Sequence, residues 1–187
     1  MKLPRTIRLD PSDRFVFDVA AEPGEWAVSG AFLFADADPE AVTGKARVAM
    51  RSGFLGVTSF GWSTLVTVTE ASEAERAEAE EALARQFVAR LGAPDLDTAR
   101  EAAREELAFA ASLCDHPINT LLTVHRAHEG EGLVERFRTL HAREPIPGAD
   151  RLHAHARAFT IEEFDDDEAP AERIDLATLA GQAGPKR

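Results

Sequence analysis

The sequence predicts an α+β fold, in which a helical pair packs on one face of a mostly antiparallel sheet and an acidic C-terminal tail follows. Residues 71–114 show the three-to-four-residue spacing of helices, whereas the stretches on either side alternate apolar and polar residues with the period of strands. Because a sheet must bury its apolar face, we expect the helical pair to be its main packing partner.

The helical pair has start and stop signals at each helix. Ser72 and Glu75 have the spacing of a capping box, in which each side chain bonds a backbone N–H at the helix start. Gly92 favours the left-handed conformation that ends a helix, and Asp95 or Asp97 can cap the next helix. The second helix offers an apolar stripe of mostly small side chains, namely Ala99, Ala103, Leu107, Ala110 and Cys114. Such small side chains predict a close approach of the packed elements.

The remaining elements are predicted from alternation and from turn residues. Trp26–Ala35 is the strongest strand pattern, because four large apolar side chains share one face. The elements expected before the helical pair are strands at 6–9, 15–19, 26–35 and 63–69, and a helix from Asp38 to Ser52. After the pair we expect a hairpin of 120–128 with 133–140 and a last strand at 154–164.

Chain length and charge runs predict one domain and a tail. The chain has 187 residues, which suits a single domain of residues 1–164 and an acidic tail of residues 165–187. The tail opens with Asp165–Glu168 and is expected to be disordered. Beyond this run, apolar spacing returns at Ile174, Leu176 and Leu179. Two interpretations stay open for this segment: a frayed terminus, or a short amphipathic helix that docks on a neighbouring subunit or partner.

The composition excludes several classes of partner. A formal net charge of −12 argues against nucleic acid and against an anionic membrane surface, because both need a basic footprint. The sequence shows no 18-residue apolar run and no apolar signal region after Met1, so we expect a cytoplasmic protein. One cysteine fits a reducing compartment. The preference for arginine over lysine and the abundance of alanine indicate a GC-rich bacterial genome.

Three stretches carry a resemblance to a known family. The segments 6–13, 53–61 and 109–117 together look like a small bacterial family of unknown function. The similarity covers nearly the whole body and excludes the tail. It implies a bacterial single-domain protein, and it assigns no activity, cofactor or catalytic residue.

The segment Gly53–Trp62 is rich in glycine and aromatic residues. It imitates a P-loop, but Trp62 stands where the phosphate-binding lysine must be, and the segment leads into a strand rather than a helix. The spacing around Ser59 is not that of a nucleophile elbow. The segment is therefore interpreted as a tight connection with aromatic plugs, or as the wall of a ligand pocket. The candidates for such a pocket are Arg51, Phe54, Ser59, Phe60, Trp62 and His125.

Cysteine and histidine offer two weaker candidates. Cys114 continues the apolar stripe at the end of a helix, where the helix dipole opposes thiolate formation, so we expect a buried and unreactive thiol. His153 and His155 lie two apart on an expected strand and share a face, which is a geometry that zinc ligands can have. Two ligands do not make a site, so ordinary histidines are the preferred interpretation. No metal and no cofactor is predicted.

Two function classes remain. The first is a non-catalytic accessory or protein-binding domain that acts through a protein partner or a second copy of the chain. The alternative is a small-molecule enzyme with a pocket at the Gly53–Trp62 loop. The first is preferred because every candidate nucleophile, base or cofactor motif is explained as well or better by a structural role. Active sites are, however, often assembled from residues distant in sequence.

Overall fold

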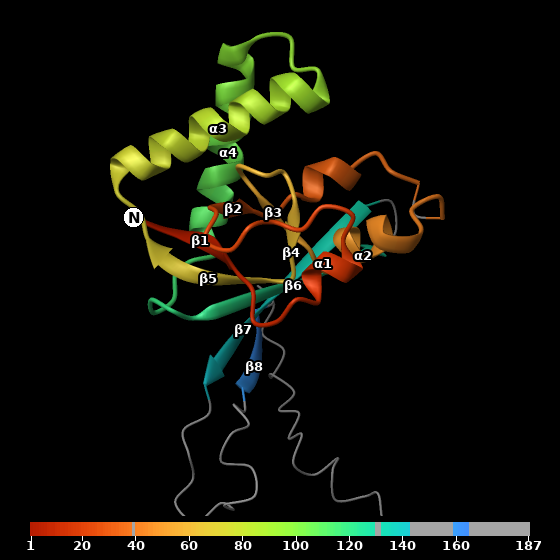
Figure 1. The fold of residues 1–187 in the computed structure, drawn as a ribbon, viewed down its shortest axis with the longest axis vertical. Coiled ribbons are helices and arrows are strands. Elements are labelled where there is room, and N and C mark those ends of the chain that lie inside the picture. Colours follow the sequence, from red (N-terminus) through yellow and green to blue (C-terminus); the bar gives the residue numbers. More distant parts are fainter. Residues whose placement is uncertain (39, 130–131, 143–158, 165–187) are drawn as a thin grey trace, which may run out of the picture.

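Two antiparallel sheets form the framework of the protein (Figure 1). The computed structural model describes residues 1–38, 40–129, 132–142 and 159–164. In this part of the chain, a five-stranded sheet has the order β1-β5-β6-β7-β8 and a three-stranded sheet has the order β2-β3-β4. The strands are β1 Lys2–Ile7, β2 Ala27–Val28, β3 Phe54–Gly56, β4 Trp62–Ser63, β5 Leu65–Glu70, β6 Leu121–Glu129, β7 Gly132–Ala142 and β8 Phe159–Phe164.

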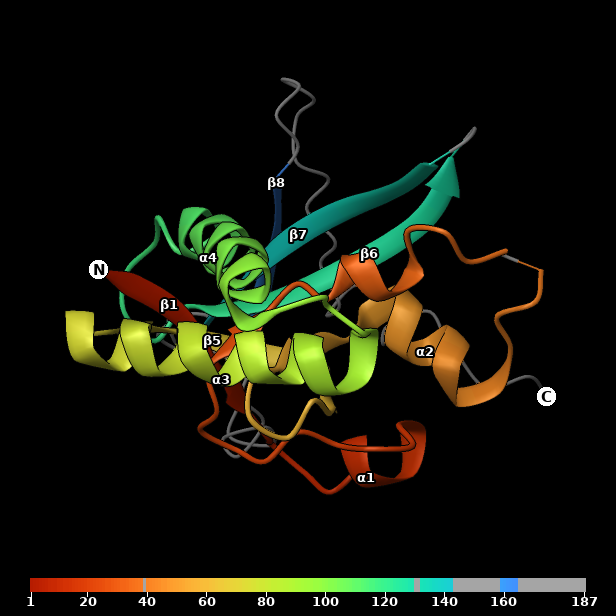
Figure 2. The same ribbon diagram turned by 90° about the horizontal axis from the view of Figure 1, so that it is seen from above.

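The helices lie outside the sheets and confirm the α+β prediction. They are α1 Asp13–Val16, α2 Gly44–Ser52, α3 Glu73–Leu91 and α4 Leu96–Ser112, with a 3-10 helix at Ala31–Phe34. The pair α3 and α4 packs together on one side of the sheets, and α3 crosses α4 (Figures 1 and 2). The short α2 packs against β6 at another place. None of the helices in the described ranges is long and apolar enough to cross a membrane.

The caps of the helical pair are those that the sequence predicted. The Glu75 backbone N–H donates to Ser72 Oγ at 3.2 Å, and the Ser72 N–H donates to the Glu75 carboxylate at 2.9 Å. Gly92 ends α3 with φ of 70°. Asp95, rather than Asp97, caps α4 by accepting a hydrogen bond from the Thr98 N–H at 2.8 Å. These caps define both helix ends locally.

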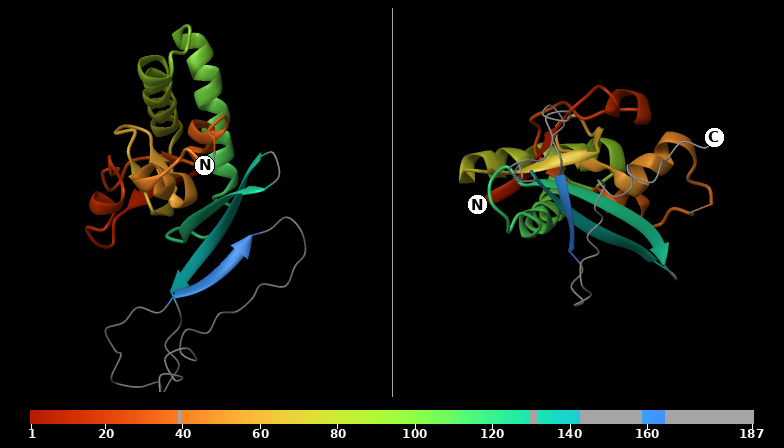
Figure 3. Two further views of the ribbon diagram at one scale, coloured as in Figure 1. Left: turned by 90° about the vertical axis from the view of Figure 1, so that its right-hand side faces the viewer. Right: turned by 90° about the horizontal axis from the view of Figure 1, so that it is seen from below.

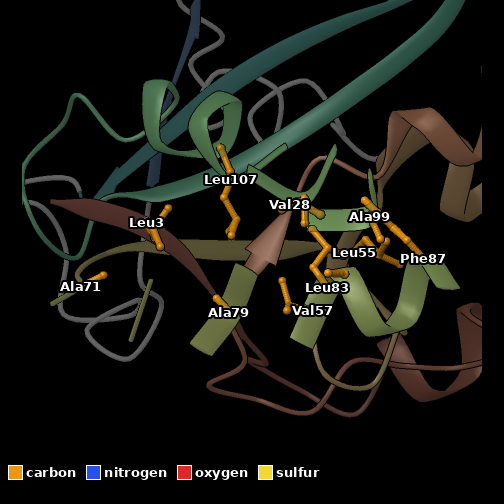
Figure 4. Packing of buried hydrophobic residues seen from close by; sticks show 13 residues of the cluster. Leu3, Val28, Leu55, Val57, Ala71, Ala79, Leu83, Phe87, Ala99 and Leu107 are labelled. Carbon is orange, nitrogen blue, oxygen red and sulfur yellow. The ribbon is translucent and has the colours of Figure 1, made fainter. Parts of the chain in front are cut away.

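The main apolar core lies between the helical pair, β1 and the three-stranded sheet (Figure 4). Alanines contribute much of the helical side, as expected from the small stripe, so larger side chains from the strands fill the space between. The core residues that Figure 4 labels are Leu3, Val28, Leu55, Val57, Ala71, Ala79, Leu83, Phe87, Ala99 and Leu107. This packing holds the helical pair in a fixed position over the sheets.

The hairpin after the helical pair is confirmed. β6 and β7 are paired from Leu121 with Leu140 to Glu129 with Gly132. β8 adds to the far side of β7, and this end of the sheet extends away from the helical pair (Figures 1 and 3). The last strand was expected at 154–164. Its C-terminal part is present as β8, and residues 154–158 lie outside the described residues. The tail at 165–187 also lies outside them, so the division at residue 164 stays a prediction.

Two strand predictions were wrong. Residues 15–19 do not form a strand, because Asp13 starts a short helix in which its buried carboxylate accepts a hydrogen bond from Thr64 Oγ1 at 2.6 Å. In the expected strand 26–35 only Ala27–Val28 is extended. Gly30 has φ of 78°, and the chain then turns into the 3-10 helix. A side chain at Gly30 would lie 2.8 Å from Leu55 Cβ, so close packing fixes this break.

The helix expected from Asp38 begins later, at Gly44. The Asp38 carboxylate accepts a hydrogen bond from the Glu40 N–H at 3.0 Å, but this bond closes a local turn rather than the first turn of α2. The end of the helix was predicted correctly, since α2 ends at Ser52 and Gly53 follows in an extended conformation. The residue pattern therefore located the C-terminal half of this element and not its start.

Candidate functional site

One arginine of β6, Arg126, is completely buried. Leu122, Val124 and Arg126 occupy alternate positions of β6 and all face inward, because side chains two apart share a face of a strand. Arg126 has an exposed fraction of 0%. Arginine is rarely buried this completely unless it is paired. The partners of Arg126 therefore show whether it has a structural or a ligand-binding role.

The guanidinium of Arg126 joins four separate elements. Its Nε donates to Glu135 Oε1 on β7 at 2.7 Å. Its Nη2 donates to Ser29 Oγ, just after β2, at 2.9 Å. Its Nη1 donates to the carbonyls of Met50 at 3.1 Å and Gly53 at 2.8 Å, in and just after the last turn of α2, where helix carbonyls have no partner within the helix.

Electrostatics around Arg126 are dominated by burial. Burial lowers the pKa of Arg126 from its ordinary value, and the neighbouring carboxylate of Glu135 opposes this shift. Ser29 Oγ also donates to the same Glu135 oxygen that Arg126 contacts. Because each guanidinium nitrogen donates a hydrogen bond to an oxygen of the protein, we interpret Arg126 as a structural cross-link rather than as a ligand-binding group.

A groove opens where the end of α3 meets α4. It has a volume of about 330 Å³, and Glu106 in its lining interacts electrostatically with Arg126 and Glu135. We call it the helical groove; it is lined by Phe32, Phe87, Leu91, Ala93, Ala102, Glu105 and Glu106. Phe32 and Phe87 meet edge to face with ring centroids 5.2 Å apart and form an aromatic wall. Leu91 is 46% exposed, so the groove is open to solvent.

Glu106 is the electrostatically unusual residue of the helical groove. Burial, together with the negative charges of Glu135 and Glu105, raises the pKa of its carboxyl from the ordinary value to about 7. Arg126 acts in the opposite direction. A carboxyl in this environment is part ionised and part neutral near neutral pH, which makes its charge sensitive to whatever occupies the groove.

A further exposed apolar side chain lies on α4 after the residues that line the helical groove. Phe109 lies one turn after Glu105 and Glu106 on the same helix face. Its side chain is 40% exposed, and its ring packs edge to face on Phe137 of β7 at a centroid distance of 5.9 Å. Exposed Leu91 therefore lines the groove, and exposed Phe109 lies one turn beyond its two glutamates on α4.

A second pocket lies at Trp62, with a volume of about 260 Å³. Trp62 packs against Phe34 at a centroid distance of 5.5 Å. Its polar groups are Asp18 and Lys45, which form an ion pair at 3.9 Å. The lining consists of Asp18, Val19, Leu33, Phe34, Lys45, Ala46, Ala49, Phe60 and Trp62. Two of the sequence-predicted pocket residues, Phe60 and Trp62, thus line one cavity.

The other four predicted pocket residues lie elsewhere. Phe54 is fully buried in the core, where its ring packs on Phe137. Ser59 Oγ accepts a hydrogen bond from the Gly61 N–H at 3.0 Å and so stabilises its own loop. Arg51 is exposed on α2, and His125 is exposed on the face of β6 opposite to Arg126. The structure therefore does not bring the six residues together.

The glycines of the 53–62 loop are explained by close packing. A side chain at Gly61 would lie 2.7 Å from the backbone carbon of Ala20, and one at Gly53 would lie 2.7 Å from the Trp62 ring. The carboxylate of Glu25 accepts hydrogen bonds from the backbone N–H groups of Thr58 at 3.0 Å and of Ser59 at 2.7 Å. A protein carboxylate thus occupies the amide groups that a phosphate would need in a P-loop.

The remaining candidates are placed as follows. Cys114 is buried, with an exposed fraction of 1%, and burial raises the pKa of its thiol to about 12. Within the described ranges, no three histidine, cysteine or acidic side chains are arranged to hold a metal ion. The histidines His153 and His155 lie outside those ranges, as do the docking candidates Ile174, Leu176 and Leu179.

Sequence reasoning missed Arg126, Glu135 and Glu106. A signal for Arg126 was available, because the alternation of Leu122 and Val124 places it on the buried face of its strand. Glu106 had a weaker signal, since it lies between Ala102 and Phe109 on one helix face. The contact between these elements depends on tertiary packing, which no local pattern reports.

The comparisons with known proteins place the chain in a family. A model of a family of unknown function, DUF6505, matches residues 1–158. The chain belongs to DUF6505. This confirms the resemblance to an uncharacterised family, and DUF6505 brings no activity, cofactor or partner with it. The search of curated proteins and the search of solved structures gave no match. Arg126, the helical groove and the Trp62 pocket all lie within the part that DUF6505 covers.

Proposed function

We propose that the protein is a non-catalytic binding protein that receives an apolar segment of another protein in the helical groove. The observation that carries this proposal is the helical groove itself, whose lining combines the aromatic wall of Phe32 and Phe87 with exposed Leu91. Amphipathic segments dock in grooves of this kind on helical pairs. The sequence adds the expectation of a bacterial cytoplasm, from its single cysteine and its composition.

The elements around the helical groove are held firmly. Arg100 of α4 pairs with Glu81 of α3 at 2.8 Å, and Arg104 pairs with Glu80 at 2.7 Å. The aromatic wall of the groove is fixed from below, because Phe87 belongs to the main core. A groove whose walls are already ordered loses little conformational entropy when a partner binds, which supports a role in recognition.

Site-specific photo-cross-linking in cells tests this proposal. A photoreactive phenylalanine analogue replaces exposed Ala102 in the helical groove, and the control places it at Arg85, an exposed position of α3 that does not line the groove. The proposal expects a cross-linked protein from position 102 that is absent from position 85. A Leu91→Asp change in the position-102 protein should abolish it. Identical products from both positions, or products that persist with Leu91→Asp, would contradict the proposal.

The Trp62 pocket favours a second candidate, a site for a small molecule. Phe60 and Trp62 line a cavity of about 260 Å³, close to the lower end of the usual range for ligand pockets. Of the polar groups that the sequence suggested, Arg51, Ser59 and His125 do not line it, so Asp18 and Lys45 would have to supply any chemistry. If the protein is a small-molecule enzyme, this pocket is where we expect its substrate to bind.

Nuclear magnetic resonance tests the second candidate. The indole N–H resonance of Trp62 is assigned with a Trp26→Phe variant, since the chain has two tryptophans. A library of small aromatic compounds should give saturable shifts of this resonance if the pocket binds ligands. An Ala46→Leu change should remove those shifts by filling the cavity. A resonance that no compound moves would remove the small-molecule candidate.

A further inference from the structure

We propose that the segment received by the helical groove carries a lysine or arginine next to its apolar residues, and that Glu106 is the residue that selects this positive charge. This inference rests on the proposed function, because it names the partner chemistry of the same groove. It follows from the charges around the groove, from their existing partners and from the apolar character of the walls.

Negative charge dominates this region. Glu105 and Glu106 come from α4 and Glu135 comes from β7, and among the described residues the cation that interacts with Glu106 is Arg126 of β6. Arg126 is already committed, because its Nε donates to Glu135 and its other nitrogens donate to Ser29 and to backbone carbonyls at the end of α2. In the described part of the chain, no lysine or arginine forms a salt bridge with Glu106. The groove therefore has a carboxylate that a cation from a partner can pair with.

The walls make this pairing selective. A purely apolar segment would cover Glu106 and remove water from its carboxylate without offering a hydrogen bond, which is unfavourable. A lysine avoids this, because its aliphatic stem can lie on Phe32 and Phe87 while its ammonium reaches the carboxylate. An acidic segment would add repulsion. The groove is thus expected to prefer cationic over neutral occupants and neutral over anionic ones.

Other occupants fit the charge less well. A second copy of this chain brings a net charge of −12, and its approach to an acidic groove is opposed by repulsion. The protein's own C-terminal segment has Arg173 beside Ile174. However, Glu172 and Asp175 flank this pair and the acidic run Asp165–Glu168 precedes it, so the segment is acidic as a whole. Charge complementarity therefore favours a basic and apolar segment of a different protein.

Three small probes test the inference: hexylammonium, hexanol and hexanoate, which share a chain length and differ in charge. Binding is followed at pH 8 by the shifts of groove resonances of Leu91 and Ala102 in the full-length protein. We expect hexylammonium to bind at least about tenfold more tightly than hexanol, with hexanoate weakest. Glu106→Gln should reduce hexylammonium to the affinity of hexanol. The matched change Glu105→Gln, at an exposed neighbour, should have a smaller effect.

The outcomes separate this inference from the proposed function. Equal affinities of hexylammonium and hexanol, with shifts confined to the groove, would overturn charge selection and leave an apolar docking groove in place. No groove shift with any probe would count against the proposed function as well. If the probes bind only to an Ile174→Asp, Leu179→Asp variant, the chain's own C-terminal segment occupies the groove, and the inference of a basic partner is overturned.

Discussion

Arg126 and Glu135 face each other at paired positions of β6 and β7, with Arg126 Nε 2.7 Å from Glu135 Oε1. The arginine has no exposed surface, and its remaining nitrogens bond Ser29 and the carbonyls that end α2. The Arg126 side chain therefore connects the hairpin, the three-stranded sheet and α2. Burial is the main cause of the raised pKa of Glu106 in the helical groove, and the charge of Glu135 adds to it, so the cross-link also influences the charge of the candidate site.

Loss of Arg126 should strongly destabilise the protein. Arg126→Met leaves partly buried Glu135 without its cation and removes the guanidinium hydrogen bonds to the carbonyls of Met50 and Gly53. We expect the free energy of unfolding to fall by about 3–5 kcal/mol, measured by urea denaturation. The control Arg85→Met removes an exposed ion pair with Glu81 and should cost less than about 1 kcal/mol. Similar losses for both variants would show that the network contributes little.

The double variant Arg126→Met, Glu135→Leu separates burial of a charge from loss of the cross-link. Removing both partners leaves no partly buried carboxylate unpaired at this position, so part of the stability lost in Arg126→Met should return. The recovery will be incomplete, because the guanidinium hydrogen bonds to the carbonyls at the end of α2 are still missing. A double variant less stable than Arg126→Met would contradict this explanation.

Neutralising Glu106 should stabilise the protein at alkaline pH. Its pKa in the folded protein is raised to about 7, so the folded state favours the protonated form. This contribution to stability is fully present below the ordinary carboxyl pKa and is lost as the pH rises through about 7. Glu106→Gln should therefore raise the free energy of unfolding by about 1–2 kcal/mol at pH 8, a value reduced for partial exposure, and change it little at pH 4.5.

The control for this pH dependence is Glu105→Gln, because Glu105 is the exposed neighbour on the same helix. The charged groups that act on Glu106 are Glu105, Glu135 and Arg126, and the comparison of two glutamine variants leaves the latter two unchanged. Denaturation curves at both pH values give the measurement. An equal gain for both variants would mean that general surface repulsion, rather than the environment of Glu106, is responsible.

Gly61 should not tolerate a side chain. A Cβ at this position would lie 2.7 Å from the backbone carbon of Ala20 and 2.8 Å from the Ala21 nitrogen, and backbone atoms cannot move aside cheaply. Gly61→Ala should lower the free energy of unfolding by about 1–3 kcal/mol. Gly132→Ala is the matched control, because a Cβ there meets nothing within 4 Å, and it should stay within about 0.5 kcal/mol of the parent. Thermal or urea unfolding of both variants measures the difference.

Local signals predicted the helical pair and the hairpin well. The capping box at Ser72, the left-handed Gly92 and the cap at Asp95 are decided by a few neighbouring residues, and each was found as expected. The alternation of Leu122 and Val124 likewise defines β6 without help from the rest of the chain. Elements with strong local consistency are the ones that a single sequence can locate.

The errors and the missed site depend on distant contacts. Trp26–Ala35 alternates like a strand, but Gly30 must approach Leu55 and Trp62, and that contact turns the chain into a 3-10 helix. Glu106 and Glu135 are far apart in sequence, and their electrostatic interaction exists only because α4 packs beside β7. Of the predicted pocket residues, the structure gathers Phe60 and Trp62 and separates the rest. Tertiary packing decided each of these cases.

Cys114 should react only when the protein opens. Its side chain is 1% exposed, and burial raises the pKa of the thiol to about 12, so almost no thiolate is present at pH 8. Labelling by a disulfide reagent should be at least about a thousandfold slower than for a peptide thiol, and urea should restore the rate. The raised pKa also means that stability from the neutral thiol is lost as the pH rises toward 12. Cys114→Ala should therefore weaken the alkaline loss of stability. Labelling of native protein at the peptide rate would show that the thiol is accessible.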